Sequence, residues 1–193
     1  MTDAPKILAF AGSTRTGSYN KTLVKIAAAG AQAAGAEVTY LDLRDLPMPL
    51  YDADLEAAEG IPENALKFKE LMTAHQGLLI ASPEYNSSMS GVLKNAIDWA
   101  SRSLPGEPML AAFNDKVAAI MSTSPGALGG LRGLVHVRSI LSNIRVLVIP
   151  DQVAIPKAHE AFDADGRLKD SQQQDSIEKL GARVAHILSK LQS

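Results

Sequence analysis

The 193-residue sequence contains no cysteine. That absence excludes a disulfide framework, thiolate catalysis, Cys-ligated zinc and Cys-ligated iron–sulfur clusters together. An excess of charge of one sign is missing as well, because 19 Lys and Arg residues stand against 21 Asp and Glu residues, for a formal net charge of −2. The field of the whole molecule therefore favours neither nucleic acid nor an anionic membrane surface, and any anion site must be local.

Long hydrophobic runs are also missing. No stretch reaches the roughly 18 apolar residues of a membrane-spanning helix, and Met1–Ala4 lacks a basic segment followed by an apolar run. We therefore expect a cytoplasmic protein with neither a membrane nor a nucleic-acid partner. The length, at roughly 150 residues per typical domain, predicts a single domain over residues 1–193.

Short apolar runs alternate along the chain with longer segments of helical period. The runs predict five buried strands, at Lys6–Ala11, Val38–Leu43, Gly77–Ala81, Lys116–Met121 and Arg145–Ile149. Apolar residues spaced near 3.6 predict helices around Leu23–Ala31, Ala65–Met72, Val92–Ala100, Leu131–Leu141 and Ser171–Leu191. Pro47–Pro62 and Pro150–Gly166 are expected to be irregular. This alternation is typical of an α/β fold with a parallel sheet covered by helices on both faces.

Three loops follow strands whose carboxyl ends should meet at one edge of that sheet, where such folds bind ligands. The first, Gly12–Asn20 (GSTRTGSYN), offers backbone N–H groups, hydroxyls, a guanidinium and a helix N-terminus, which together suit a phosphate. A dinucleotide fingerprint is excluded by Thr14 and a Walker loop by Ser18, which stand where those motifs need glycine and lysine. An ordinary capped turn remains the alternative for this loop.

The other two loops suit a flat heterocycle or a close neighbour. Ser82–Ser88 carries Tyr85 and Asn86, whose ring face and amide can read a ring system, although a plain Pro-containing surface loop fits the pattern equally well. Ser122–Gly130 is rich in small residues, which permit close approach of a ligand or serve as a flexible connector.

Other chemistries find little support in the sequence. The four histidines, at positions 75, 136, 159 and 186, form no pair with metal-ligand spacing, so no metal site is predicted. No Gly-x-Ser-x-Gly elbow is present for a serine hydrolase. Asp98 and Trp99 lie in the third expected helix and are interpreted as structural residues, with Trp99 in the core or an interface.

Taken together, these loops resemble those of the NADPH-dependent FMN reductase family, which includes quinone, azo-dye and chromate reductases. The resemblance rests on GSTRTGSYN at Gly12–Asn20, PEYNSSMSGVLKNAIDW at Pro83–Trp99 and, more loosely, SPGALGGLR at Ser124–Arg132. It implies a flavodoxin-like fold whose five-stranded parallel sheet has the order 2-1-3-4-5. It also implies bound FMN, NADPH or NADH as co-substrate, and small-molecule electron acceptors.

The resemblance further implies roles for particular residues. The positions that hold the FMN phosphate in the family are matched by Ser13, Arg15, Ser18 and Asn20, with Tyr19 in the variable place between them. The segment along the isoalloxazine ring is matched by Pro83, Glu84, Tyr85 and Asn86. The part of the third loop that borders the flavin is matched by Ser124 and Gly126. No catalytic acid or base is expected, because hydride passes from the nicotinamide to flavin N5 and onward by a ping-pong sequence. Family members are typically homodimers or dimers of dimers, which predicts an interface on the third and fourth expected helices.

A flavodoxin-type electron carrier that docks to protein partners is the alternative. Such carriers usually have a strongly acidic docking surface and aromatic side chains around the flavin. The net charge of −2 and the aromatic content of 5% favour the enzyme.

Overall fold

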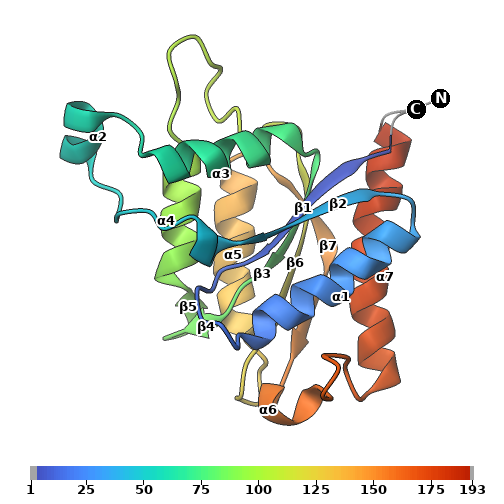
Figure 1. Ribbon diagram of the computed structural model, residues 1–193. Helices are drawn as coiled ribbons and strands as arrows, with labels where there is room; N and C mark the ends of the chain where they lie inside the picture. The colour runs from blue at the N-terminus through green and yellow to red at the C-terminus, as the bar shows by residue number, and fades with distance from the viewer. Residues whose placement is uncertain (1–3, 192–193) are drawn as a thin grey trace.

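A five-stranded parallel sheet organises the computed structural model, which describes residues 4–191. Its strands are β1 (Lys6–Ala11), β2 (Glu37–Asp42), β3 (Gly77–Ala81), β6 (Val117–Thr123) and β7 (Leu147–Ile155). They lie in the order β2-β1-β3-β6-β7 (Figure 1), and each pair is parallel. Counted along the chain, these five strands have the predicted order 2-1-3-4-5, so the flavodoxin-like topology is confirmed.

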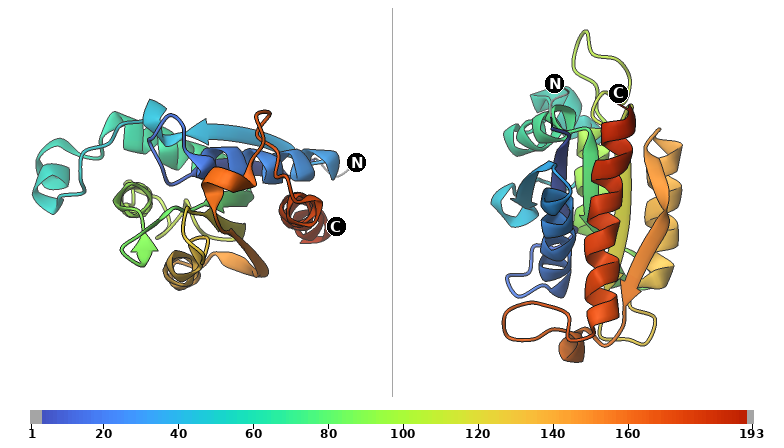
Figure 2. Two further views of the ribbon diagram at one scale, coloured as in Figure 1. Left: turned by 90° about the horizontal axis from the view of Figure 1, so that it is seen from below. Right: turned by 90° about the vertical axis from the view of Figure 1, so that its right-hand side faces the viewer.

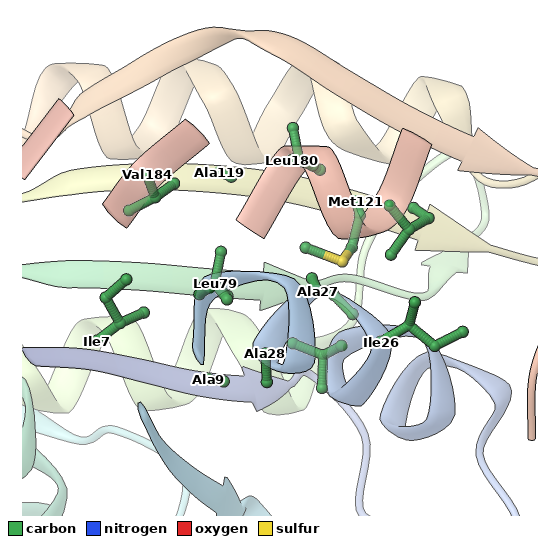
Figure 3. Close-up of a cluster of buried hydrophobic side chains, with 14 of the residues drawn as sticks. Ile7, Ala9, Ile26, Ala27, Ala28, Leu79, Ala119, Met121, Leu180 and Val184 are labelled. Carbon is green, nitrogen blue, oxygen red and sulfur yellow. The ribbon is translucent and has the colours of Figure 1, made fainter. Parts of the chain in front are cut away.

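Helices cover both faces of the sheet. Helices α1 (Tyr19–Ala33) and α7 (Ser171–Leu191) pack on one face, and α3 (Glu63–Ala74), α4 (Gly91–Ala100) and α5 (Leu131–Asn143) pack on the other (Figure 2). Successive strand residues alternate between the two cores, so that Ile7 and Leu79 meet α1 and α7 (Figure 3) while Leu8 and Leu78 face the opposite layer. Every residue of β3 and β6 is buried, which explains why these strands are continuous apolar runs.

Two segments are more regular than the sequence indicates. Strand β7 continues through Pro150, although Pro150–Gly166 was expected to be irregular; it is an edge strand, and its register with β6 shifts around this proline. A short helix, α6 (Ala158–Ala161), also lies in this segment.

Within Pro47–Pro62, α2 (Ala53–Glu59) is capped by Asp52, whose carboxylate accepts the N–H groups of residues 54 and 55. Trp99 is fully buried, and its indole N–H donates to the carbonyl of Pro49 at 2.8 Å, so its interpretation as a core residue is correct. Leu43–Asp45 forms a single 3-10 turn after β2.

The carboxyl ends of β1, β3 and β6 lie at one edge of the sheet, towards the bottom of Figure 1, together with the start of α1 and with α6. Strand order reverses between β1 and β3, so this edge is the switch point at which ligands bind in such folds. Within residues 4–191, no helix combines the length and the apolar character needed to cross a membrane.

Candidate functional site

A cavity of about 250 Å³ opens at this edge of the sheet. It brings together all the predicted site residues except Asn86 and Gly126; its walls are formed by Ser13, Arg15, Ser18, Tyr19, Asn20, Pro83, Glu84, Tyr85, Thr123, Ser124 and Pro125. Thr123 and Pro125 were not predicted, because a strand end and a loop proline carry no recognisable binding signal in the sequence. The three loops after β1, β3 and β6 therefore share one site.

The N-terminus of α1 opens toward this cavity. Ser18 is its N-cap and is only 6% exposed, yet its hydroxyl makes no capping hydrogen bond to the helix. The first turn contains no acidic residue. The first N–H groups of the helix and its positive dipole end are thus available to an anion.

Arg15 stands beside this helix end. It is exposed, and none of the ion pairs of the described residues involves it. Its guanidinium lies 5.7 Å from the centroid of the Tyr19 ring, which in turn stacks on Phe162 at 5.7 Å. A cation without an acidic partner, next to a positive helix end, is stabilised when an anion binds between them.

The side chain of Asn20 is already engaged. Its amide nitrogen donates to the carbonyl of Thr123 at 2.9 Å, and its oxygen accepts the N–H of Thr123 at 3.1 Å. This paired contact joins the start of α1 to the end of β6, 103 residues away. Asn20 therefore holds two walls of the cavity together, and only its backbone N–H is free to meet a ligand.

Contacts with β2 fix the other side of the β1–α1 loop. Asp42 accepts from Lys21 Nζ at 2.6 Å and from the N–H of Arg44 at 3.0 Å, and the Arg44 guanidinium donates to the hydroxyl of Thr16. Although burial alone would raise it, the pKa of Asp42 is lowered by the hydrogen bonds from Lys21 and Arg44. The positive charge of Lys21 is thus neutralised away from the cavity.

A hairpin forms the wall after β3, where the sequence indicated only a loop. Strands β4 (Glu84–Tyr85) and β5 (Ser88–Met89) pair antiparallel, and the two linking residues, Asn86 and Ser87, have φ values of 50° and 65°. This left-handed pair is typical of a tight hairpin turn. Asn86 is at the tip of the turn and does not line the cavity, whereas Tyr85 lines it and is 59% exposed.

The carboxylate of Glu84 is engaged by residues at the start of α5. It accepts from the Arg132 guanidinium at 2.6 and 3.0 Å and from the N–H of Gly133, in the first turn of α5, at 3.0 Å. Burial opposes ionisation, but the Gly133 N–H and Arg132 hold the pKa of Glu84 below its usual range. Only the backbone of Glu84 is therefore free to contact a ligand.

The loop after β6 is shaped by close backbone packing. Gly130 has a φ of 93°, and a Cβ there would lie 1.9 Å from Ser122 Oγ, so only glycine fits. The carbonyl of Gly126 accepts from the N–H groups of Gly129 and Lys157, and Gly126 does not line the cavity. Ser122 is fully buried and donates to the carbonyl of Ser82, as a structural residue does.

Among residues 4–191, no group of three or more His, Asp or Glu side chains is placed to hold a metal ion. His75 is buried between the carbonyl of Leu71 and the hydroxyl of Thr39, and His136 contacts Ser88 Oγ at 2.8 Å.

The sheet order, with an uncapped helix N-terminus at its switch point, is that of a flavodoxin-like fold. A model of the NADPH-dependent FMN reductase family matches residues 5–160. The chain belongs to this family, and the resemblance inferred from its loops is confirmed. It is an oxidoreductase whose cofactor is FMN and whose reductant is NAD(P)H.

Individual relatives support the same assignment. An NAD(P)H-dependent FMN reductase of Pseudomonas aeruginosa is 41% identical over 180 residues, covering 93% of this chain and 92% of the relative. A quinone reductase of Escherichia coli is 38% identical over 154 residues, covering 77% and 76%. Among solved structures, the flavoenzyme FerB, an NAD(P)H:acceptor oxidoreductase from Paracoccus denitrificans, superposes with a TM-score of 0.80 at 27% identity, covering 96% of this chain and 98% of FerB.

The residues around the cavity fit a flavin mononucleotide. The uncapped helix end, the unpaired Arg15 and the hydroxyls of Ser13 and Ser18 form a donor set for a phosphate dianion. On the neighbouring wall, the hairpin presents the Tyr85 ring and backbone groups, as a planar ring system requires.

Proposed function

We propose that this protein oxidises NAD(P)H and delivers the electrons to quinones and other small acceptors, with FMN bound in the cavity between the β1, β3 and β6 loops. The observation that carries the proposal is the convergence of an open helix N-terminus, an unpaired guanidinium and a hairpin wall at the switch point of the sheet. Quinones are proposed because the Escherichia coli relative is named a quinone reductase.

In this proposal, the start of α1 binds the phosphate. The hydroxyls of Ser13 and Ser18 and the backbone N–H groups of Tyr19 and Asn20 donate to phosphate oxygens, and Arg15 supplies the balancing charge. Asn20 acts through its backbone, because its amide is held by Thr123.

The β4–β5 hairpin and the β6 loop orient the ring system. Pro83, Glu84 and Tyr85 offer backbone groups along one edge, while Ser124 borders the other side of the cavity. Asn86 and Gly126, which lie outside the cavity walls, act through the turn and the loop that they shape. The Arg132 guanidinium and the N–H of Gly133 engage the carboxylate of Glu84, so that Glu84 would meet the ring system of FMN through its backbone.

When bound, FMN supplies the two-electron chemistry between reductant and acceptor, so no side-chain nucleophile or metal is needed. The protein offers one open face, at Tyr85, to reductant and acceptor in turn. A shared face predicts ping-pong kinetics, with parallel double-reciprocal lines when NADPH and a quinone are varied. Because nicotinamide nucleotides and a cysteine-free sequence both suit a reducing compartment, we place this activity in the cytoplasm.

We also propose that the protein is a homodimer or a dimer of dimers. Helices α4 and α5 lie side by side on one face (Figures 1 and 2). These helices and the loop before α5 expose four apolar side chains, Val92, Leu128, Leu131 and Val135, the last at 59%.

Val135→Glu should therefore shift the mass measured by light scattering towards that of a monomer. Leu147→Glu, at an equally exposed leucine on the edge strand β7, is the matched control. A wild-type monomer at micromolar concentration would contradict the proposal.

The decisive experiment is anaerobic stopped-flow with the FMN-loaded protein. NADPH and NADH should each be tested for bleaching of the flavin, followed by mixing with a quinone, free flavin and an azo dye. We expect reduction and then rapid reoxidation by the quinone. Tight FMN binding without reduction by either nucleotide would instead support a flavodoxin-type carrier.

A further inference from the structure

A second cavity lies at the opposite, amino-terminal edge of the sheet. Its volume is about 480 Å³, within the usual range for sites that bind small molecules. It is lined by Gln76, Asp115, Lys116, Val117, Arg145, Leu147, Leu188 and Leu191. The C-terminal end of α7 forms one wall, at the top of Figure 1, far from the hairpin and α6. None of these residues belongs to the proposed flavin site.

One part of the lining is apolar and partly uncovered. Leu147 and Leu191 are 57% and 66% exposed, and they line the cavity together with the buried Leu188 and Val117. Large apolar side chains that are exposed together around a cavity are typical of a binding surface. The apolar portion of an occupant can therefore be covered by these residues.

The polar part of the lining has a net charge of plus one. Lys116 is only 5% exposed, and among the described residues its ammonium has a single acceptor, the carbonyl of His75 at 2.6 Å. Burial lowers the pKa of Lys116, against an opposing effect of Asp115. Arg145 adds a second cation and Asp115 a carboxylate. Such a group of charges is complementary to a single anionic head group.

Backbone strain marks the same place. Asp115 and Arg145 have φ values of 59° and 74°, in the left-handed region that side chains of L-residues rarely adopt. Each stands just before a strand, β6 or β7, and together they bring a carboxylate and a guanidinium to the cavity. Strain of this kind is retained where the surrounding structure or a ligand compensates for it.

We propose that this cavity binds a small amphipathic monocarboxylate, with its carboxylate between Lys116 and Arg145 and its apolar body against Leu147, Leu188 and Leu191. The ligand supplies the ammonium of Lys116 with a second acceptor and covers the exposed leucines. The site is independent of the flavin, because its residues lie at the other end of β6 and β7.

The test uses the FMN-loaded protein and octanoate, with binding measured by isothermal titration calorimetry. An occupant of this size, held by Lys116 and Arg145, should bind with a Kd of about 0.1–1 mM. Octan-1-ol and octylammonium keep the apolar body but lack the negative charge, and each should bind at least about fivefold more weakly. Flavin fluorescence, recorded in parallel, should not change as octanoate is added.

Three substitutions locate the ligand. Lys116→Gln should weaken octanoate binding most, by roughly tenfold or more. Arg145→Gly should weaken it by about 3- to 10-fold without lowering the melting temperature, since glycine accepts a φ of 74°. Asp115→Asn should tighten it by about 2- to 5-fold, because a repelling charge is removed at a position where asparagine tolerates the backbone.

A matched control is Lys179→Gln, which removes an exposed cation from α7 outside the cavity and should leave octanoate affinity unchanged. Equal affinities for octanoate and octan-1-ol would overturn the proposal. So would unchanged binding in both Arg145→Gly and Asp115→Asn. Release of flavin by octanoate would locate the binding at the other cavity and would also overturn it.

Discussion

Two helices, α1 and α5, begin at the rim of the candidate flavin site after loops that contain glycine, and neither has a capping side chain at its own N-cap. At α5, the N-cap is Gly130, and the carboxylate of Glu84 reaches across from the hairpin to accept the N–H of Gly133. At α1, the N-cap is Ser18, whose hydroxyl makes no such bond, and no carboxylate fills the place.

This difference indicates which of the two helix N-termini is expected to bind the anion of a ligand. A helix N-terminus carries unpaired N–H groups and a partial positive charge, which are normally satisfied by a side chain or a ligand. The protein satisfies α5 with its own carboxylate, paired to Arg132, and leaves α1 beside the unpaired Arg15. We therefore propose that the phosphate of FMN binds at α1, while the carboxylate of Glu84 is a structural anion and Glu84 meets the cofactor only through its backbone.

A carboxylate placed at the start of α1 should impair FMN binding most. Ser18→Asp places a carboxylate where the phosphate is proposed to bind, and like charges about 4 Å apart at the protein surface repel by about 4 kcal/mol. FMN affinity should fall roughly a thousandfold. The apo-protein should melt at the same or a higher temperature, because Asp is as good an N-cap as Ser.

Ser18→Asn is the matched control, since it has the size of aspartate without the charge, and it should retain most of the FMN affinity. FMN titration of the two apo-proteins by fluorescence quenching separates the cases. If Ser18→Asp binds FMN as tightly as the wild type, the phosphate does not lie at this helix end.

The next largest effect is expected at Arg15. A charge-assisted hydrogen bond contributes about 1.5–3 kcal/mol, so Arg15→Ala should weaken FMN binding by about 10- to 150-fold. Riboflavin, which lacks the phosphate, should lose far less affinity. Because Arg15 is exposed, the stability of the apo-protein should change by less than about 1 kcal/mol. Equal losses for both flavins would place the phosphate elsewhere.

Most of the fold and of the β1–α1 side of the candidate site could be predicted from the sequence, because they depend on residues that are close together along the chain. The β1–α1 loop follows a continuous apolar strand and leads into an amphipathic helix, so the residues of the loop and its position at the sheet edge could be read directly from the sequence. The strand order followed from the family resemblance and is confirmed by the sheet.

The features that the sequence did not reveal depend on contacts between distant residues. Glu84 and Arg132 are 48 residues apart, as are Ser88 and His136, and no local pattern pairs them. The β4–β5 hairpin was missed because its turn residues, Asn86 and Ser87, lack the glycine that usually marks such turns. Strand β7 continues through Pro150 because an edge strand with a register shift tolerates a residue without an N–H group. The edge position and the register shift could not be predicted from the sequence.

A smaller effect on affinity, with a clear effect on folding, is expected at Asn20, which links α1 to β6. Asn20→Ala leaves the buried N–H and carbonyl of Thr123 without partners, so it should destabilise the protein by about 1–3 kcal/mol in urea unfolding. Because Asn20 positions the cavity walls and does not select the phosphate, FMN and riboflavin should lose affinity by similar factors. A selective loss of FMN would show that the Asn20 side chain binds the phosphate.

The smallest effect is expected at Glu84, the carboxylate already present at the start of α5, and it is an effect on the free energy of unfolding that depends on pH. The pKa of Glu84 is held below its unfolded value, so its ionised form stabilises the fold above about pH 4.3, and this contribution is lost as the pH falls through the folded pKa. Glu84→Gln should therefore cost about 1 kcal/mol of unfolding free energy at neutral pH, and the difference from the wild type should shrink towards pH 3.

Glu63→Gln, in an exposed pair with Lys67, is the matched control and should leave the pH profile nearly unchanged. Urea unfolding of the apo-proteins between about pH 3 and 7 gives these differences. A Glu84→Gln deficit that does not depend on pH would mean that Glu84 acts by packing and not as a charged cap of α5.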